Sequence, residues 1–153
     1  MDIAWTASEF FLQFTNAPLI ITILCLAIHS HLNQATIAAF SLLCFNAILA
    51  RYLKMLFMIP LPASLGIVDY AFLSGHMLIA TSLYGFLAFH NNRISTYTGV
   101  GILLMGIALG LIHHGYHNAY DVSAAFAIAA ATIAYLYQPL IHRYNSTLIL
   151  LIV

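Results

Sequence analysis

The sequence predicts an all-α, polytopic membrane protein that folds as one helical bundle. Of its 153 residues, 63% are hydrophobic and only 5% are charged, whereas soluble domains carry about 25% charged residues. Apolar runs separated by short polar segments have the length of roughly 20 residues that a helix needs to cross a bilayer. We therefore expect a single transmembrane domain over residues 1–153, without a separate soluble domain.

The charge of the chain excludes some classes of partner, and its two cysteines lie in apolar runs. Four Lys+Arg residues balance four Asp+Glu residues, so the chain offers no basic surface to nucleic acid and no acidic tail to a cationic partner. Cys25 and Cys44 lie in apolar runs, where we expect packed thiols, with an interhelical disulfide as the alternative. The acidic N-terminal segment lacks the basic region of a cleaved signal peptide, which predicts a retained first span. Whether the chain forms a homo-oligomer stays open.

Five spans are expected, and the first three precede residue 90. The first is predicted over residues 10–28, where Pro18 kinks the helix or marks the start of its regular part. The second is predicted over residues 37–58, and the two prolines and one glycine of residues 60–66 end it. The third runs from residue 69 or 70 to 89, with residues 74–76 in its first turns.

The last two spans are rich in small residues. The fourth is predicted over residues 97–116, and its Gly106 and Gly110 form a small-xxx-small pair that lets another helix approach closely. The fifth is alanine-rich, suited to tight packing, and is predicted over residues 119–138. The apolar residues 147–153 are too few to cross a membrane.

This topology gathers polar residues at one membrane face. With five spans, Lys54, residues 74–76 and residues 113–121 lie on the same side, and ionisable groups at membrane depth indicate a functional site. Arg93 and Arg143 flank helices on the other side, which the positive-inside rule places in the cytoplasm. The site is therefore expected to face the periplasm or a lumen.

The stretch Gly-Leu-Ile-His-His-Gly-Tyr-His-Asn-Ala-Tyr-Asp-Val, residues 110–122, contains the densest group of ionisable residues. If it is helical, His113, His117 and Asp121 step by four residues along one face, with His114 at its edge. A carboxylate one turn from a histidine orients the ring and makes it a better nucleophile. A histidine on a facing helix, His76, is placed to protonate a leaving oxygen. The pattern favours phosphoryl-transfer chemistry.

Candidate groups to hold phosphate oxygens lie in the same set. Lys54, the Ser74 hydroxyl and the backbone N–H groups around Gly75 qualify, because donors at a helix start suit an anion. Protonated His113 or His114 would add positive charge. With Lys54 as the nearby permanent cation, a singly charged phosphodiester suits the site better than a doubly charged monoester.

The arrangement resembles the type-2 phosphatidic acid phosphatase superfamily, whose three motifs read K-x6-R-P, P-S-G-H and S-R-x5-H-x3-D. Lys54 and Pro62 keep the spacing of the first motif, and Leu61 occupies its arginine position. The second motif stands here as Leu73-Ser74-Gly75-His76. The third keeps His117 and Asp121, with Gly110 and Leu111 at its serine and arginine positions.

The sphingomyelin-synthase-like branch of that superfamily is more similar still, because it also lacks the phosphate-binding arginines. Its proline-rich break, its Asp before Ser-Gly-His and its H-Y-[ST]-x-D-V motif correspond to Leu61-Pro62, Asp69 and residues 117–122, with Asn118 at the tyrosine position. The resemblance covers roughly residues 37–137. It implies a lipid substrate with a phosphate-linked headgroup, no metal and no cofactor. It also implies roles for three residues: His117 as the nucleophile that forms a phosphohistidine, Asp121 as its orienting partner, and His76 as acid and then base.

Three other interpretations stay open. His113, His117 and Asp121 have the helical spacing of a metal site, which His76 or His114 would complete. Paired histidines such as His76 and His114 also bind haem. The third interpretation is a non-catalytic relative that binds lipid or serves in an assembly.

Overall fold

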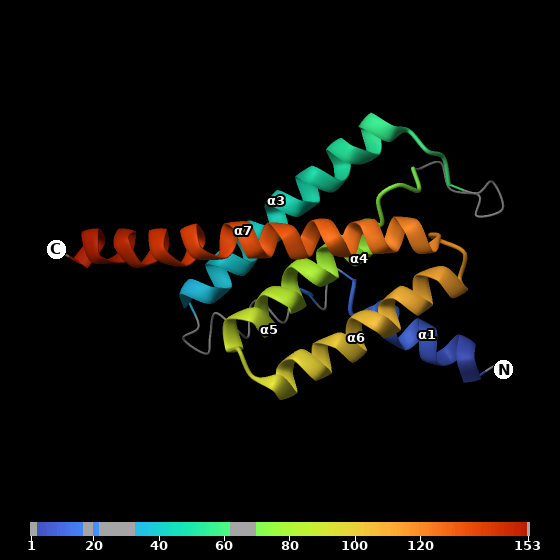
Figure 1. Ribbon diagram of the computed structural model, residues 1–153, viewed down its shortest axis with the longest axis horizontal. Helices are drawn as coiled ribbons and strands as arrows, with labels where there is room; N and C mark the ends of the chain where they lie inside the picture. The colour runs from blue at the N-terminus through green and yellow to red at the C-terminus, as the bar shows by residue number, and fades with distance from the viewer. Residues whose placement is uncertain (1–2, 17–19, 22–32, 62–69, 153) are drawn as a thin grey trace.

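The computed structural model describes residues 3–16, 20–21, 33–61 and 70–152, although for residues 3–5, 33–34 and 137–152 it describes the backbone alone. The described elements are all helical, which confirms the all-α part of the predicted fold class. In chain order they are α1 (Ile3–Gln13), α3 (Asn33–Phe57), α4 (Gly75–Ala80), the π-helical turn η2 (Thr81–Gly85), α5 (Phe86–Asn91), α6 (Ile94–His113) and α7 (Ala119–Ile152). In Figure 1, α3 crosses the long α7, and α6 lies between α7 and α1.

Three of the described helices are long and apolar enough to cross a membrane. They are the segments Ala35–Phe57, Ile94–His113 and Ala119–Leu136. Each exposes large apolar side chains, such as Ile48, Met105 and Tyr135, as expected where lipid rather than water surrounds the bundle. The helices therefore fit a membrane-embedded protein, whereas they do not confirm the count of five spans.

The N-terminal helix differs from the predicted first span. It begins at Ile3 and ends at Gln13, and residues 14–16 form a turn, so a continuous helix starting at residue 10 is wrong. The Thr15 hydroxyl donates to the Leu12 carbonyl at 2.7 Å, and the Asn16 amide donates to the Gln13 side chain at 2.6 Å. Such local side-chain hydrogen bonds compete with helix continuation. Residues 17–19 and 22–32, including Cys25, lie outside the described residues; Cys44 is a free thiol.

Helix α1 packs closely on α6 at the two glycines that the sequence singled out. A Cβ added to Gly106 would lie 2.5 Å from the Phe11 ring, and one added to Gly110 would lie 3.1 Å from the Ser8 carbonyl oxygen. Any larger residue at these positions would push α1 away from α6. The predicted close helix approach is confirmed, and α1 is the helix that approaches.

The next helical segment, residues 75–91, begins later than residue 69 or 70. Ser74 caps it, since its hydroxyl accepts a hydrogen bond from the Met77 N–H at 3.4 Å. Before the cap the backbone is extended: Tyr70 bridges to Pro60, and the Ala71 N–H donates to the Ile59 carbonyl at 2.7 Å. These contacts hold residues 70–74 against the end of α3, so they cannot be the first turn of a helix.

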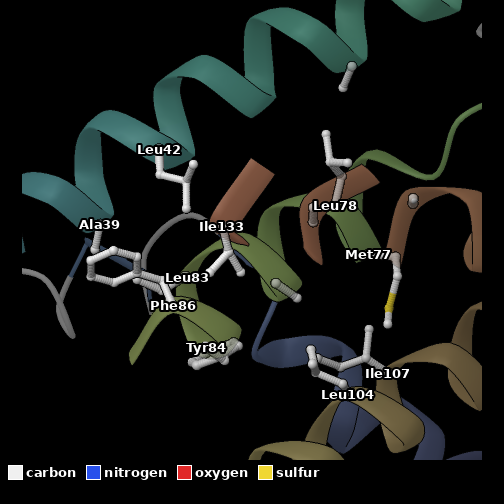
Figure 2. Packing of buried hydrophobic residues seen from close by; sticks show 14 of the residues in the cluster. Ala39, Leu42, Met77, Leu78, Leu83, Tyr84, Phe86, Leu104, Ile107 and Ile133 are labelled. Carbon is white, nitrogen blue, oxygen red and sulfur yellow. The ribbon is translucent and has the colours of Figure 1, made fainter. Parts of the chain in front are cut away.

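Buried apolar residues of four helical segments form the core (Figure 2). Met77 points toward Leu104 and Ile107 of α6, whereas Leu42 of α3 points toward Ile133 of α7. In α7, Ala125 and Ala129 are fully buried, which confirms that its alanines serve tight packing.

Helix α7 continues through Pro139 to Ile152, so its predicted end at residue 138 is wrong. Proline is tolerated within membrane helices where neighbouring helices, Ser or Thr side chains and local backbone adjustments satisfy the groups that it frees.

Candidate functional site

The stretch 110–122 is two helices joined by a tight turn. Helix α6 ends at His113, and Gly115 adopts the left-handed conformation with φ +70°. The Tyr116 N–H donates to the Leu111 carbonyl at 3.1 Å and the Gly115 N–H to the Ile112 carbonyl at 3.0 Å, the Schellman pattern of a helix C-terminus. The predicted helix to residue 116 is wrong, and so is the common helical face of His113, His117 and Asp121.

Helix α7 starts with a capping box that the sequence analysis missed. The Asp121 N–H donates to Asn118 Oδ1 at 2.9 Å, and the Asn118 N–H donates to Asp121 Oδ2 at 3.2 Å. This reciprocal pairing satisfies two donors at the helix start. The signal was present, because an Asn followed three residues later by an acid reads as a helix N-terminus. The Asp121 carboxylate is therefore held by the backbone N–H of Asn118.

His117 and Asp121 nevertheless form a pair. Nδ1 of His117 lies 3.9 Å from Oδ2 of Asp121, and both side chains are buried, with 6% and 5% exposed. The distance exceeds the roughly 3.2 Å limit of an N–H···O hydrogen bond, and Nδ1 has no hydrogen-bond partner among the described residues. The turn thus achieves the predicted pairing by a route other than a continuous helix.

Charged groups from three segments act on His117. The pKa of His117 is lowered to about 4, mainly by burial and also by the charges of Lys54 and His76, although Asp121 and the backbone carbonyl of Ala71 act to raise it. His117 is therefore a neutral imidazole at neutral pH. The same interactions show that Lys54 of α3 and His76 of α4 lie within electrostatic reach of the α6–α7 turn.

These three segments lie at one end of the bundle. Figure 1 shows the C-terminal end of α3 and the α6–α7 turn at the same end. The Ser74 N–H donates to the Asp121 carbonyl at 3.4 Å, which ties the start of α4 to the start of α7. Lys54 is half-buried and His76 is exposed.

Ser74 and Gly75, at the start of α4, differ in how closely other residues surround them. The Ser74 side chain is fully buried and its hydroxyl caps α4, so it has a structural role, and its contact with a phosphate stays a prediction. Apart from its chain neighbours and its own helix backbone, no atom of the described residues lies within 4 Å of the position that a Cβ of Gly75 would take. Among the described residues, none covers the start of α4 on this side.

The other two histidines of the stretch face a different part of the molecule. His113 is exposed. The Nε2 atom of His114 lies 2.9 Å from the Ser8 hydroxyl of α1, and its ring stacks on Tyr116. These contacts direct His114 to α1, which does not favour the predicted phosphate-binding role.

The metal interpretation fails on the same geometry. Among the described residues, which include all five candidate ligands, no group of three or more His, Cys, Asp or Glu side chains is arranged to hold a metal ion. Pro62 and Asp69, which entered the resemblance, lie outside the described residues.

Comparison with known proteins leaves these residues to be interpreted from their geometry. No family model matches the chain, and neither a curated protein nor a solved structure matches it.

Proposed function

We propose that this protein is a membrane-embedded phosphoesterase or phosphotransferase that cleaves or transfers a phosphate-linked lipid headgroup. The observation that carries the proposal is the convergence on one buried imidazole. Lys54 and His76, from two other helices, both act on His117, whose partner is the buried Asp121. The order of the three motifs along the sequence, which resembles the sphingomyelin-synthase-like branch, adds support.

The chemistry follows from these positions. Because Nδ1 of His117 faces Asp121, Nε2 is the nitrogen that attacks phosphorus. The P–O bond to the leaving group breaks as His76 gives its proton to that oxygen, which leaves a phosphohistidine and a neutral His76. His76 then takes a proton from water or a lipid alcohol, whose oxygen attacks phosphorus and releases His117. Asp121 stabilises the positive ring between the two steps.

The charges favour a phosphodiester. At neutral pH His117 is uncharged, since burial lowers its pKa to about 4, which leaves Lys54 as the permanent cation of the site. The positive charge that His76 carries as the acid is lost with its proton, so Lys54 remains, and it compensates the single negative charge of a diester better than the two charges of a monoester. The open side of Gly75 gives phosphate oxygens access to the start of α4.

The proposed topology has five spans. Residues 75–91 and the N-terminal segment add to the three helices that are long and apolar enough. Arg93, which is exposed at the start of α6, would mark the cytoplasmic side. The site would then lie on the extracytoplasmic side.

A non-catalytic lipid-binding protein is the second candidate. The capping box favours it, because it gives Asp121 a structural role and holds the carboxylate 3.9 Å from His117.

Turnover on two lipids separates these candidates. Purified protein in detergent is given a phosphodiester lipid and a phosphomonoester lipid in parallel, and headgroup, phosphate and new lipid products are measured. We expect diester turnover that falls about 10²- to 10⁴-fold in His117→Ala and His76→Ala. His90→Ala, an exposed histidine of α5, is the matched control and should keep wild-type turnover. Full activity in His117→Ala, or binding of both lipids without turnover, would overturn the enzymatic proposal.

A further inference from the structure

A buried hydrogen-bonded junction joins three helical segments below the site. Asn46 of α3 is fully buried, and its amide nitrogen donates to the Ser82 hydroxyl of η2 at 2.8 Å and to the Thr132 hydroxyl of α7 at 2.9 Å. The two hydroxyls donate in turn to the carbonyls of Leu78 and Ala129, at 2.6 and 2.8 Å. Because their protons are used, they can only accept from Asn46, so the orientation of the amide is fixed.

The junction uses the same three segments that carry the site. Lys54 follows Asn46 by about two turns of α3, Ser82 follows His76 by about two turns, and Thr132 follows Asp121 by about three turns. The junction therefore lies roughly 9 to 17 Å below the site.

The junction is one of the contacts that position the second half of α3. Asn46 and Ala50 are buried on one face, and after Ala50 none of the described residues of α3 is buried. Figure 1 shows this end of α3 leaving the side of α7. Lys54 thus lies on the part of α3 that projects from α7, between the junction and the contacts of Ile59 and Pro60 with Ala71 and Tyr70.

Stability alone does not account for an asparagine at this position. Asn46 Oδ1 has no hydrogen-bond partner among the described residues, and a buried unpaired acceptor is unfavourable. An apolar side chain of similar size would leave both hydroxyls bonded to their own helices. Buried polar residues retained under such conditions are best attested as devices that fix helix register.

We propose that Asn46 is a positioning residue, whose amide fixes the register of α3 against residues 75–91 and α7 and so holds Lys54 beside His76 and His117. The inference rests on the proposed function for its catalytic meaning, but its structural part can be tested without turnover.

The structural test measures the pKa of His117 by NMR of histidine-labelled protein in detergent. The groups that act on His117 are Lys54, His76, Asp121 and the Ala71 carbonyl. Lys54→Met should raise the pKa of His117 in the wild-type background, because a nearby positive charge is removed. Asn46→Leu alone should also raise it, and Lys54→Met should then add little. A Lys54→Met response of full size in the Asn46→Leu background would overturn the inference.

The control variant is Thr81→Val. Thr81 is buried next to Ser82, and its hydroxyl has no partner among the described residues, so the change removes a buried hydroxyl without touching the junction. It should leave the response to Lys54→Met intact. Should Asn46→Leu fail to fold, Ser82→Ala and Thr132→Val each remove one link and should each weaken the response in part. Full responses in both would count against the inference.

The catalytic test separates kcat from KM on the phosphodiester lipid. Asn46→Leu should lower kcat on the order of 10- to 100-fold, as displacement of a catalytic group by about 1 Å does, with KM and the unfolding temperature near those of wild type. Equal losses of kcat in Asn46→Leu and Thr81→Val would overturn the positioning role. Absence of wild-type turnover would refute the proposed function, and the NMR cycle would still decide whether Asn46 holds Lys54.

Discussion

The two turns that flank α6 share a backbone device but differ in what they bury. Asn92, before α6, and Gly115, after it, both adopt left-handed conformations, with φ of 50° and 70°. At the first turn, His90, Asn91 and Arg93 are exposed. At the second, the side chains of His117 and Asp121 are 6% and 5% exposed.

The difference arises from the neighbouring segment. Residues 70–74 lie against the second turn, where the Ser74 N–H bonds to the Asp121 carbonyl, whereas the Asn91 amide of the first turn reaches Thr96 in an exposed contact. A polar turn therefore becomes a candidate site when another segment covers it. The covering removes water and shifts the pKa of its histidine.

The largest expected effect concerns the carboxylate. Asp121→Asn keeps an acceptor for the Asn118 N–H, so the helix start should survive, but it removes the charge that stabilises a positive His117 ring. We expect headgroup release to fall about 10²- to 10⁴-fold, with an unchanged unfolding midpoint. The corresponding change at the exposed turn, Asn91→Ala, should leave turnover intact; a loss there would contradict the comparison.

Substitution of Gly115, in the turn after α6, should destabilise the protein more than substitution of Asn92, in the turn before it. Gly115→Ala places a Cβ in a left-handed conformation, which costs roughly 1–2 kcal/mol. Asn92→Gly relieves the same strain and should be neutral or slightly stabilising. Denaturant unfolding of both variants measures the difference, and equal effects would show that the turns are under equal constraint.

The pH dependence of stability should differ between variants of the buried His117 and of the exposed His90. Burial lowers the pKa of His117 from 6.5 to about 4, so between these values the unfolded chain binds more protons than the folded one. Stability should therefore be full above pH 6.5 and should fall as the pH drops toward 4. Thermal unfolding in this range should lose part of its pH dependence in His117→Gln and keep it in His90→Gln.

The smallest expected effect on stability comes from a substitution in the exposed turn before α6. Asn91→Ala removes the exposed hydrogen bond to Thr96 and should change the free energy of unfolding by less than about 0.5 kcal/mol. Asp121→Ala, which opens the capping box, should cost roughly 0.5–2 kcal/mol. Comparable values would mean that burial adds nothing to the cap.

The spans of α3, α6 and α7 were predictable because each long apolar run has a single helical solution in lipid. The glycine pair of α6 was also readable, since only small residues admit a second helix. Residues 14–16, by contrast, were predicted as helix because hydropathy does not register side chains that bond to the local backbone.

The site was predictable in part. The grouping of Lys54, His76, His117 and Asp121 at one membrane face was predicted from a five-span topology, whereas the predicted helical face that included His113 is broken by the turn at Gly115. Gly115 and the Asn118–Asp121 capping box are signals of this turn in the sequence. They were overlooked because the apolar residues around them suggested one continuous helix. The role of Asn46 could not have been read at all, because Ser82 and Thr132 reach it only in the folded bundle.

One oxygen atom of Asp121 contacts both the candidate nucleophile and the start of α7. Oδ2 of Asp121 accepts the Asn118 N–H at 3.2 Å and faces His117 at 3.9 Å. When the ring gains positive charge, the attraction that draws this oxygen toward the imidazole weakens its bond to the amide. If the proposed reaction takes place, the cap of α7 should loosen while the ring is charged, and amide hydrogen exchange at Asn118 should be faster during turnover than at rest.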